Sequence, residues 1–143
     1  MNGSVVVDAS VAIAWVVRSQ VSDQESLDLL DSVLAGSVIV VPVLWAFEVA
    51  NSLLALLRRR VVDDGQYERA RNNLASLQSI VDEEGPRLAL TETSTLAQKY
   101  SLSVYDAVYL ELALRRRLPL ATRDSSLNKA AKRAGVRTLL STR

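Results

Sequence analysis

Short apolar runs rich in β-branched residues recur along the chain, and they restrict the possible folds more than any other feature. Ser4–Val7 and Val38–Val41 consist almost entirely of valine and isoleucine, and neither run alternates with polar residues. Strands with one wet face alternate, whereas strands buried on both faces do not. Helical segments separate these runs along the chain. The sequence therefore predicts an α/β fold in which helices cover both faces of a parallel sheet.

The turn signals and the spacing of apolar residues predict the remaining elements. A capping box at Ser22–Glu25 begins one helix, which Gly36 ends, and Gly85-Pro86 ends a long helix that begins near Asp63. No repeat or linker composition interrupts the chain, so we expect one domain over residues 1–143. The expected strands are residues 4–7, 38–41, 87–90, 118–122 and 136–140, and the expected helices are residues 10–17, 22–36, 44–59, 63–84, 91–100, 103–116 and 125–134. This order predicts a three-layer α/β/α sandwich around a central parallel five-stranded sheet.

The chain lacks both cysteine and histidine, which excludes several kinds of chemistry. Without cysteine there is no disulfide framework and no thiolate metal site. Without histidine there is no Ser-His-Asp triad, and the commonest zinc ligand is missing. A hydrolase built from this chain must use carboxylates, hydroxyls, lysine or a metal held by oxygen atoms.

Charge and hydropathy indicate the kind of partner and the compartment. The formal net charge is only +1, but neutralising four of the 16 acids with a metal would leave a clear positive excess, which suits a polyanion. No basic segment precedes a long apolar run at the N-terminus, and the apolar stretch Val38–Phe47 is too short to span a bilayer and contains Pro42. We expect a soluble cytoplasmic protein that does not bind membranes.

Two acids are expected at the carboxyl ends of strands. Asp8 directly follows the first strand, and Asp124 follows the strand at 118–122 by two residues. Ligands of open α/β sheets bind in the crevice outside these strand ends. Each acid is equally well explained as the N-cap of the helix that follows it. Both interpretations remain open from the sequence.

A third acid, Glu48, lies in a helix that is apolar almost all round, and such a helix is expected to be buried. An unpaired buried carboxylate costs several kcal/mol or becomes neutral. Asn51 lies three residues later on the same face and could satisfy Glu48, as could a distant arginine. A cation would account for the same burial.

The fourth acid, Asp106, follows Ser103 by three residues, so it fits a capping box as well as a site. Four carboxylates at one edge of a sheet would repel each other, and a hard divalent cation such as Mg²⁺ or Mn²⁺ would relieve that repulsion. It would also supply a water of lowered pKa as the nucleophile for phosphodiester hydrolysis. Ser10 and Thr122 could position such a water, or could simply be turn and strand-end residues.

These residues lie in segments that resemble the PIN-domain nucleases and, among them, the VapC toxins of bacterial toxin–antitoxin pairs. The segments occur in the family's order and span nearly the whole chain; they are Val6–Val11, Pro42–Leu53, Leu102–Leu110, Leu120–Asp124 and Ala130–Val136. The resemblance implies a Mg²⁺- or Mn²⁺-dependent endoribonuclease that cuts structured RNA, often transfer or ribosomal RNA. The family's acidic positions fall on Asp8, Glu48, Asp106 and Asp124, and its supporting polar positions fall on Ser10, Asn51 and Thr122.

The resemblance also implies partners, and the chain departs from the family's pattern at two positions. It implies a homodimer formed through helices beside the site, and a small VapB-type antitoxin whose tail occupies the site. Ser101 and Arg117 stand where the family often has glycine, which affects the geometry of two loops and leaves the acids untouched.

Some features remain open to two interpretations. The arginine runs Arg58–Arg60 and Arg115–Arg117 could steer a phosphate backbone or could be solvated helix ends. Trp15 and Trp45 are expected in the core or an interface. Receiver domains and haloacid-type phosphatases need a second acid beside the first, which Asp8-Ala-Ser10 lacks. A PIN nuclease of RNA processing and a silent PIN-like binding module remain as alternatives, although a silent module has no chemical reason to keep all four acids.

Overall fold

Four parallel strands form the central sheet of this computed structural model, which describes residues 3–17 and 24–141. The strand order is β3-β2-β1-β4, so β1 and β2 are the inner strands and β3 is at an edge. The register pairs Val6 of β1 with Val40 of β2 on one side and with Leu120 of β4 on the other. The strands are β1 (Ser4–Val7), β2 (Val38–Pro42), β3 (Ser79–Asp82) and β4 (Leu120–Ala121).

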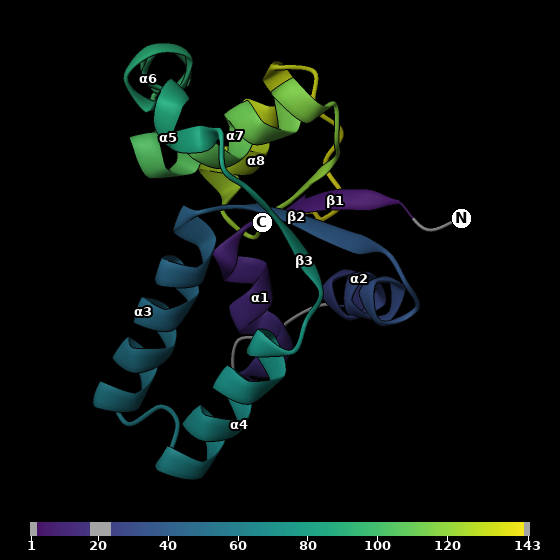
Figure 1. The fold of residues 1–143 in the computed structure, drawn as a ribbon, viewed down its shortest axis with the longest axis vertical. Coiled ribbons are helices and arrows are strands. Elements are labelled where there is room, and N and C mark those ends of the chain that lie inside the picture. The colour runs from purple at the N-terminus through teal and green to yellow at the C-terminus, as the bar shows by residue number, and fades with distance from the viewer. Residues whose placement is uncertain (1–2, 18–23, 142–143) are drawn as a thin grey trace.

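Helices cover both faces of the sheet and make three layers, as the sequence predicts (Figure 1). Helices α1 to α4 lie on one side, and α5 to α8 lie on the other. The helices are α1 (Ala9–Val16), α2 (Gln24–Leu34), α3 (Leu44–Arg58), α4 (Asp64–Ala75), α5 (Gly85–Leu88), the π-helical turn η2 (Ala89–Thr93), α6 (Ser94–Tyr100), α7 (Val104–Arg116) and α8 (Ser125–Arg133). No helix of the described ranges is long and apolar enough to cross a membrane.

The core lies where the inner strands meet the helices. The side chains of Val6, Val7 and Ile39 are fully buried, as expected for strands covered on both faces. Helix α7 packs across β1, β2 and β4 and contributes Leu110 and Leu112 to this core. Because β1 is central and ends at Val7, the residue that follows it lies at the middle of the carboxyl edge of the sheet.

The sheet has four strands, and the expectation of five is wrong in this respect. Residues 136–140 do not form a strand; they contact β4 through a single parallel bridge between Leu120 and Thr138. Two backbone hydrogen bonds, from Leu120 to Arg137 and from Leu139 to Leu120, account for this contact. Strand β4 itself has only two residues, which leaves little edge on which a fifth strand could pair.

The segment from 63 to 90 also differs from expectation. The helix predicted over 63–84 ends at Ala75, because Ile80 and Val81 enter strand β3 and pair with β2. The strand predicted over 87–90 is helical, since Pro86 stands in the first turn of α5 and favours that start. The capping box predicted at Ser22 falls in residues 18–23, outside the described ranges; the structure confirms the helix after it, α2, up to Leu34.

Candidate active site

Asp8 lies at the carboxyl end of β1, where it both caps α1 and accepts hydrogen bonds from two hydroxyls. The backbone N–H of Ser10 donates to Oδ1 of Asp8 over 3.4 Å. The hydroxyls of Ser10 and Thr122 both donate to Oδ2, over 3.1 Å and 2.6 Å. Asp8 is only 7% exposed. The carboxylate is therefore buried and fixed from two sides.

The loop after β4 brings Asp124 to the same edge of the sheet. Thr122 follows β4 directly, and its hydroxyl accepts a hydrogen bond of 3.0 Å from the backbone N–H of Asp124. The backbone N–H of Arg123 donates to the hydroxyl of Ser10. Asp124 itself is exposed and caps α8 through the N–H of Leu127. Ser10 and Thr122 thus join the two loops that carry Asp8 and Asp124.

Glu48 lies near the start of α3, and its partner is Tyr109 of α7. The Tyr109 hydroxyl donates to Oε1 of Glu48 over 2.6 Å. Among the described residues, the hydrogen bond to Glu48 comes from Tyr109, and not from an arginine or from Asn51, which is exposed. The expectation that α3 is buried all round is also wrong, because Phe47 is 71% exposed and Glu48 is half-buried. Sequence reasoning missed Tyr109, whose one signal is a hydroxyl within the apolar stretch of α7.

Asp106 occupies the first turn of α7. Its backbone N–H donates to the hydroxyl of Ser103, so the predicted cap is present. The carboxylate is half-buried and lies near enough to Asp124 and Asp8 for both to raise its pKa. Asp106 therefore lies in the capped first turn of α7 and also belongs to the acidic group.

The four acids form one electrostatic group. Burial raises the pKa of Asp8, and the charge of Asp124 raises it further, against the lowering effect of the Thr122 and Ser10 hydrogen bonds. Burial also raises the pKa of Glu48, and the charges of Asp8 and Asp106 add to the effect. For Asp106 the causes are burial and then the charges of Asp124 and Asp8. Exposure increases from Asp8 through Glu48 and Asp106 to Asp124, so the group extends from the core to solvent.

The donors at this edge fit a hard divalent cation. All are oxygen atoms, and no lysine or arginine is among the causes that set the pKa values of Asp8, Glu48 and Asp106. Within the described ranges, however, no three carboxyl groups are close enough together to enclose an ion as they stand. Carboxylates that repel each other separate when no cation is between them. The edge is therefore a set of donors and not a preformed cage.

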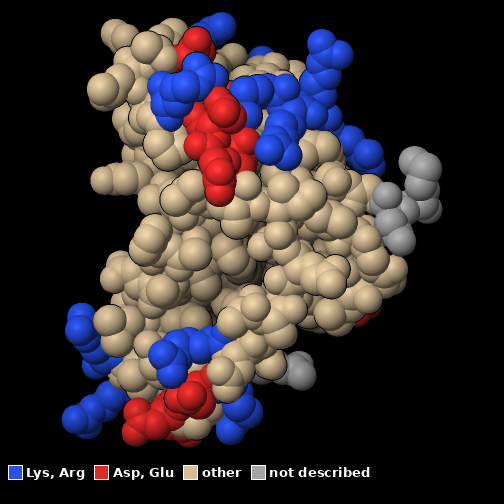
Figure 2. Space-filling model, in the orientation of Figure 1, with Lys and Arg blue, Asp and Glu red and all other residues tan. Residues whose placement is uncertain are grey.

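A second charged cluster lies at the other end of α7 and has a structural role. Asp82, at the end of β3, is 1% exposed and accepts hydrogen bonds from Arg115 over 2.9 and 2.7 Å and from Arg116 over 3.1 Å. Arg115 also bonds Glu111, which is buried. These ion pairs engage two of the three arginines of the run at 115–117. Figure 2 shows blue and red side chains intermixed in two groups, separated by a wide uncharged band.

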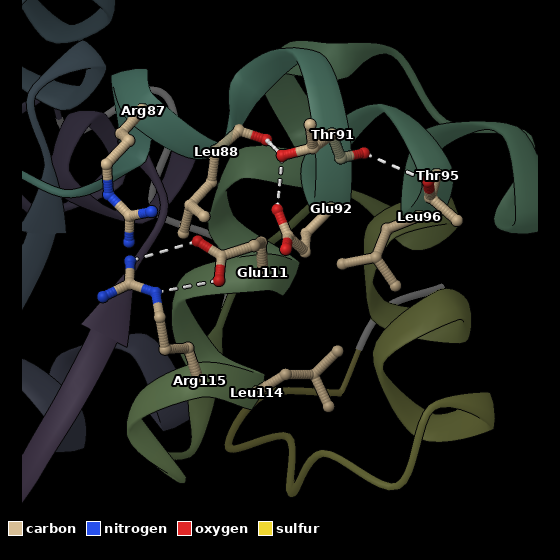
Figure 3. Close-up of a pocket in the computed structure, with 9 residues that line it drawn as sticks. All are labelled: Arg87, Leu88, Thr91, Glu92, Thr95, Leu96, Glu111, Leu114 and Arg115. Atoms are coloured by element: carbon tan, nitrogen blue, oxygen red, sulfur yellow. Dashed lines mark hydrogen bonds and ion pairs between the residues drawn. The ribbon is translucent and has the colours of Figure 1, made fainter.

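A cavity of about 840 Å³ lies beside this cluster, between η2 and α6 on one side and α7 on the other (Figure 3). Leu88, Leu96 and Leu114 line it, together with Glu111 and Arg115. None of the four acids at the carboxyl edge lines this cavity. It is therefore distinct from the acidic group.

The comparisons with known proteins agree with this geometry. The family model described as PIN domain matches residues 5–133, which include all four acids. This chain belongs to the PIN domain family.

Solved structures share the PIN fold over nearly the whole chain. PAE2754 from Pyrobaculum aerophilum is 23% identical, with a TM-score of 0.66 over 95% of this chain and 83% of that one. FitAcB from Neisseria gonorrhoeae is 16% identical, with a TM-score of 0.63 over 95% and 96%. VapBC2 from Rickettsia felis, bound to a DNA fragment from its promoter, is 9% identical, with a TM-score of 0.66 over 97% and 98%. A search of curated proteins found no match.

Proposed function

We propose that this PIN-domain protein is a Mg²⁺- or Mn²⁺-dependent endoribonuclease and the toxin of a VapBC-type pair. Its substrate would be structured RNA, such as transfer or ribosomal RNA, in the cytoplasm. The observation that carries the proposal is the electrostatic group of Asp8, Glu48, Asp106 and Asp124, in which burial and the charges of neighbouring acids raise the pKa values of Asp8, Glu48 and Asp106. Such an arrangement is costly for a fold and useful for holding a cation.

The four carboxylates would hold the cation, and the hydroxyls would fix them. A divalent ion bound there lowers the pKa of a bound water and stabilises negative charge on the phosphoryl oxygens. Thr122 and Ser10 hold the Asp8 carboxylate in place. Asp124 and Asp106, which lie nearer solvent, are where a phosphodiester would approach. Addition of water to phosphorus would break the bond to the 3′ oxygen, which leaves with a proton, and would form a 5′-phosphate.

The negative charge of the four acids also suits an antitoxin partner. Structures that share this fold include a toxin–antitoxin complex from Klebsiella pneumoniae and the VapBC2 complex. A group of acids open to solvent attracts a basic side chain as well as a metal ion. A VapB-type antitoxin whose tail places an arginine or lysine among these acids would compete with the cation. This competition would silence the nuclease.

A homodimer is the proposed assembly. Phe47 on α3 and Tyr105 on α7 are 71% and 63% exposed, and each directly precedes one of the four acids. Leu90 on η2 is 92% exposed. Exposed apolar side chains of this size mark an interaction surface. A second copy that covers them would place its own acidic group near the first.

Cleavage of RNA by wild type and Asp8→Asn tests the nuclease proposal. Total RNA would be incubated with each protein in Mg²⁺, in Mn²⁺ and in EDTA. We expect discrete fragments only with wild type and only with a divalent ion. Asn at position 8 keeps the size of the side chain and one of its two accepting oxygen atoms, and it removes the negative charge. Equal, metal-independent fragment patterns from both proteins would exclude the proposal.

Expression in a bacterial host distinguishes a toxin from a housekeeping nuclease. We expect wild type to arrest growth and Asp8→Asn to permit it at the same protein level. Mapping the 5′ ends of RNA cut in these cells would identify the target. Cleavage in vitro without growth arrest would favour a PIN nuclease of RNA processing.

A further inference from the structure

Tyr109 links two helices of the candidate site. It belongs to α7 and is fully buried. Its hydroxyl donates to Oε1 of Glu48 on α3, over a distance of 2.6 Å. The backbone amide of Ala9, the residue after Asp8, lies near the same hydroxyl. The hydroxyl therefore connects α7 to α3 close to the end of β1.

The hydrogen bond to Glu48 sets the direction of the hydroxyl. A phenol has one hydrogen to donate, and an ionised carboxylate can only accept. The hydrogen of the Tyr109 hydroxyl is therefore directed at Glu48. Burial and the nearby charge of Glu48 raise the pKa of Tyr109 well above its usual value, so the hydroxyl stays protonated wherever a nuclease works. Glu48 thus has a permanent donor.

A permanent donor on one oxygen determines what the other oxygen can do. With Oε1 held by Tyr109, Oε2 of Glu48 remains for a cation or for a water that the cation binds. Glu48 is half-buried, so a side chain without this hydrogen bond could turn toward solvent. Tyr109 therefore holds Glu48 in a single orientation.

We propose that Tyr109 is a positioning residue that holds Glu48 ready for the divalent cation, through the hydrogen bond that its hydroxyl donates to Oε1 of Glu48. This inference rests on the proposed function, because it assumes that Glu48 contributes to a metal site. Groups that orient metal ligands in this way typically alter metal affinity by about 10–100-fold when they are removed.

The test measures Mn²⁺ affinity in Tyr109→Phe, with electron paramagnetic resonance used to count unbound Mn²⁺. Phenylalanine keeps the buried ring and removes only the hydroxyl, so the fold is expected to persist, which far-UV circular dichroism would check. Tyr67→Phe is the matched control, because Tyr67 lies on α4 and contacts Arg71. We expect Tyr109→Phe to bind Mn²⁺ about tenfold more weakly and Tyr67→Phe to bind like wild type.

Two further measurements separate positioning from mere stability. We expect saturating Mn²⁺ to restore RNA cleavage by Tyr109→Phe toward the wild-type rate, which a folding defect would not allow. In the Glu48→Gln background, adding Tyr109→Phe should weaken Mn²⁺ binding no further. If Tyr109→Phe binds Mn²⁺ as tightly as Tyr67→Phe does, while Asp8→Asn and Glu48→Gln bind it weakly, the positioning role is wrong and the nuclease proposal stands. If Asp8→Asn and Glu48→Gln also bind Mn²⁺ like wild type, the metal site itself is wrong.

Discussion

Asp8 places a carboxylate at the end of a buried strand, and its ionisation opposes folding when no cation is bound. Burial and the charge of Asp124 raise the pKa of Asp8 above the ordinary value of an aspartate. A carboxyl group whose pKa is higher in the folded state stabilises the fold most when the pH is below its pKa in the unfolded chain. This stabilisation is lost as the pH rises through its pKa in the folded protein. We therefore expect Asp8→Asn to stabilise the metal-free protein at pH 7 by on the order of 1 kcal/mol.

Thermal melting in EDTA at several pH values would measure this effect. The gain from Asp8→Asn should be largest at pH 7 and should shrink toward pH 3.5, where Asp8 is protonated in wild type too. Asp31→Asn, at an exposed position of α2, should show no such trend. A constant gain across the pH range would mean that ionisation of Asp8 is not its cause.

The four acids could be identified from the sequence, but the sequence did not decide whether each of them caps a helix or belongs to a functional site. Asp8 and Asp124 do cap α1 and α8, and Ser103 does cap the helix that carries Asp106. The two interpretations are compatible, because a capping carboxylate still has oxygen atoms to share. The partner of Glu48 could not be predicted, since Tyr109 lies 61 residues away and only the tertiary fold brings the two side chains together.

Among the elements, α7 is anchored to the edge strand β3 by Asp82. The guanidinium of Arg115, through hydrogen bonds and charge, lowers the pKa of Asp82 below the ordinary value of an aspartate, with a further contribution from Arg116. Because the pKa of Asp82 is lowered in the folded protein, its carboxylate stabilises the fold when the pH is above the pKa of the unfolded chain. This stabilisation is lost as the pH falls through the pKa of the folded protein. We expect Asp82→Asn to cost about 2 kcal/mol at pH 7, because Arg115 and Arg116 lose charged hydrogen bonds.

Urea unfolding of Asp82→Asn at pH 7 and at pH 3 would measure that cost. The difference from wild type should diminish as the pH falls toward the lowered pKa of Asp82, because its carboxylate then becomes protonated. Glu84→Gln is the comparison, because Glu84 and Arg87 form an exposed pair whose loss should cost about 1 kcal/mol or less. Equal costs for the two substitutions would show that Asp82 does not anchor α7.

The ends of α6 and α7 contain the two departures from glycine, and both adopt the left-handed conformation. Ser101 has φ of 55° and Arg117 has φ of 56°. Residues other than glycine are strained there by about 1–2 kcal/mol. We expect Arg117→Gly to raise the free energy of unfolding by about 0.5–1 kcal/mol. Arg137→Gly removes a similarly exposed arginine that lacks positive φ, so it should not stabilise, and chemical denaturation would compare the two.

The elements were predictable where one local signal was sufficient. Strands β1 and β2 and helix α7 followed from apolar runs and a serine cap. Strand β3 was missed because its residues are mostly exposed at the sheet edge, and they continue a segment of helical composition. Pairing with β2, which no local pattern encodes, makes Ile80 and Val81 a strand. The fifth strand, predicted at residues 136–140, does not form for a related reason, because β4 has only two residues and offers too short an edge for pairing.

At the scale of the whole molecule, the proposed contact between two copies lies around Phe47, whose side chain is 71% exposed and which directly precedes Glu48. If a second copy covers this surface, a charge at position 47 should separate the copies. We expect Phe47→Asp to weaken dimerisation at least a hundredfold, because an aspartate buried at an interface loses its hydration without a partner.

Sedimentation equilibrium over a range of concentrations would measure the effect of Phe47→Asp on association. Leu34→Asp is the matched control, because Leu34 is 69% exposed at the end of α2, away from α3 in Figure 1. It should associate like wild type. Because Phe47 and Glu48 are adjacent, Mn²⁺ affinity must be measured in parallel, and an unchanged value would show that the substitution acts on assembly and not on the acids. A wild-type chain that stays monomeric at all concentrations would mean that each acidic group works alone.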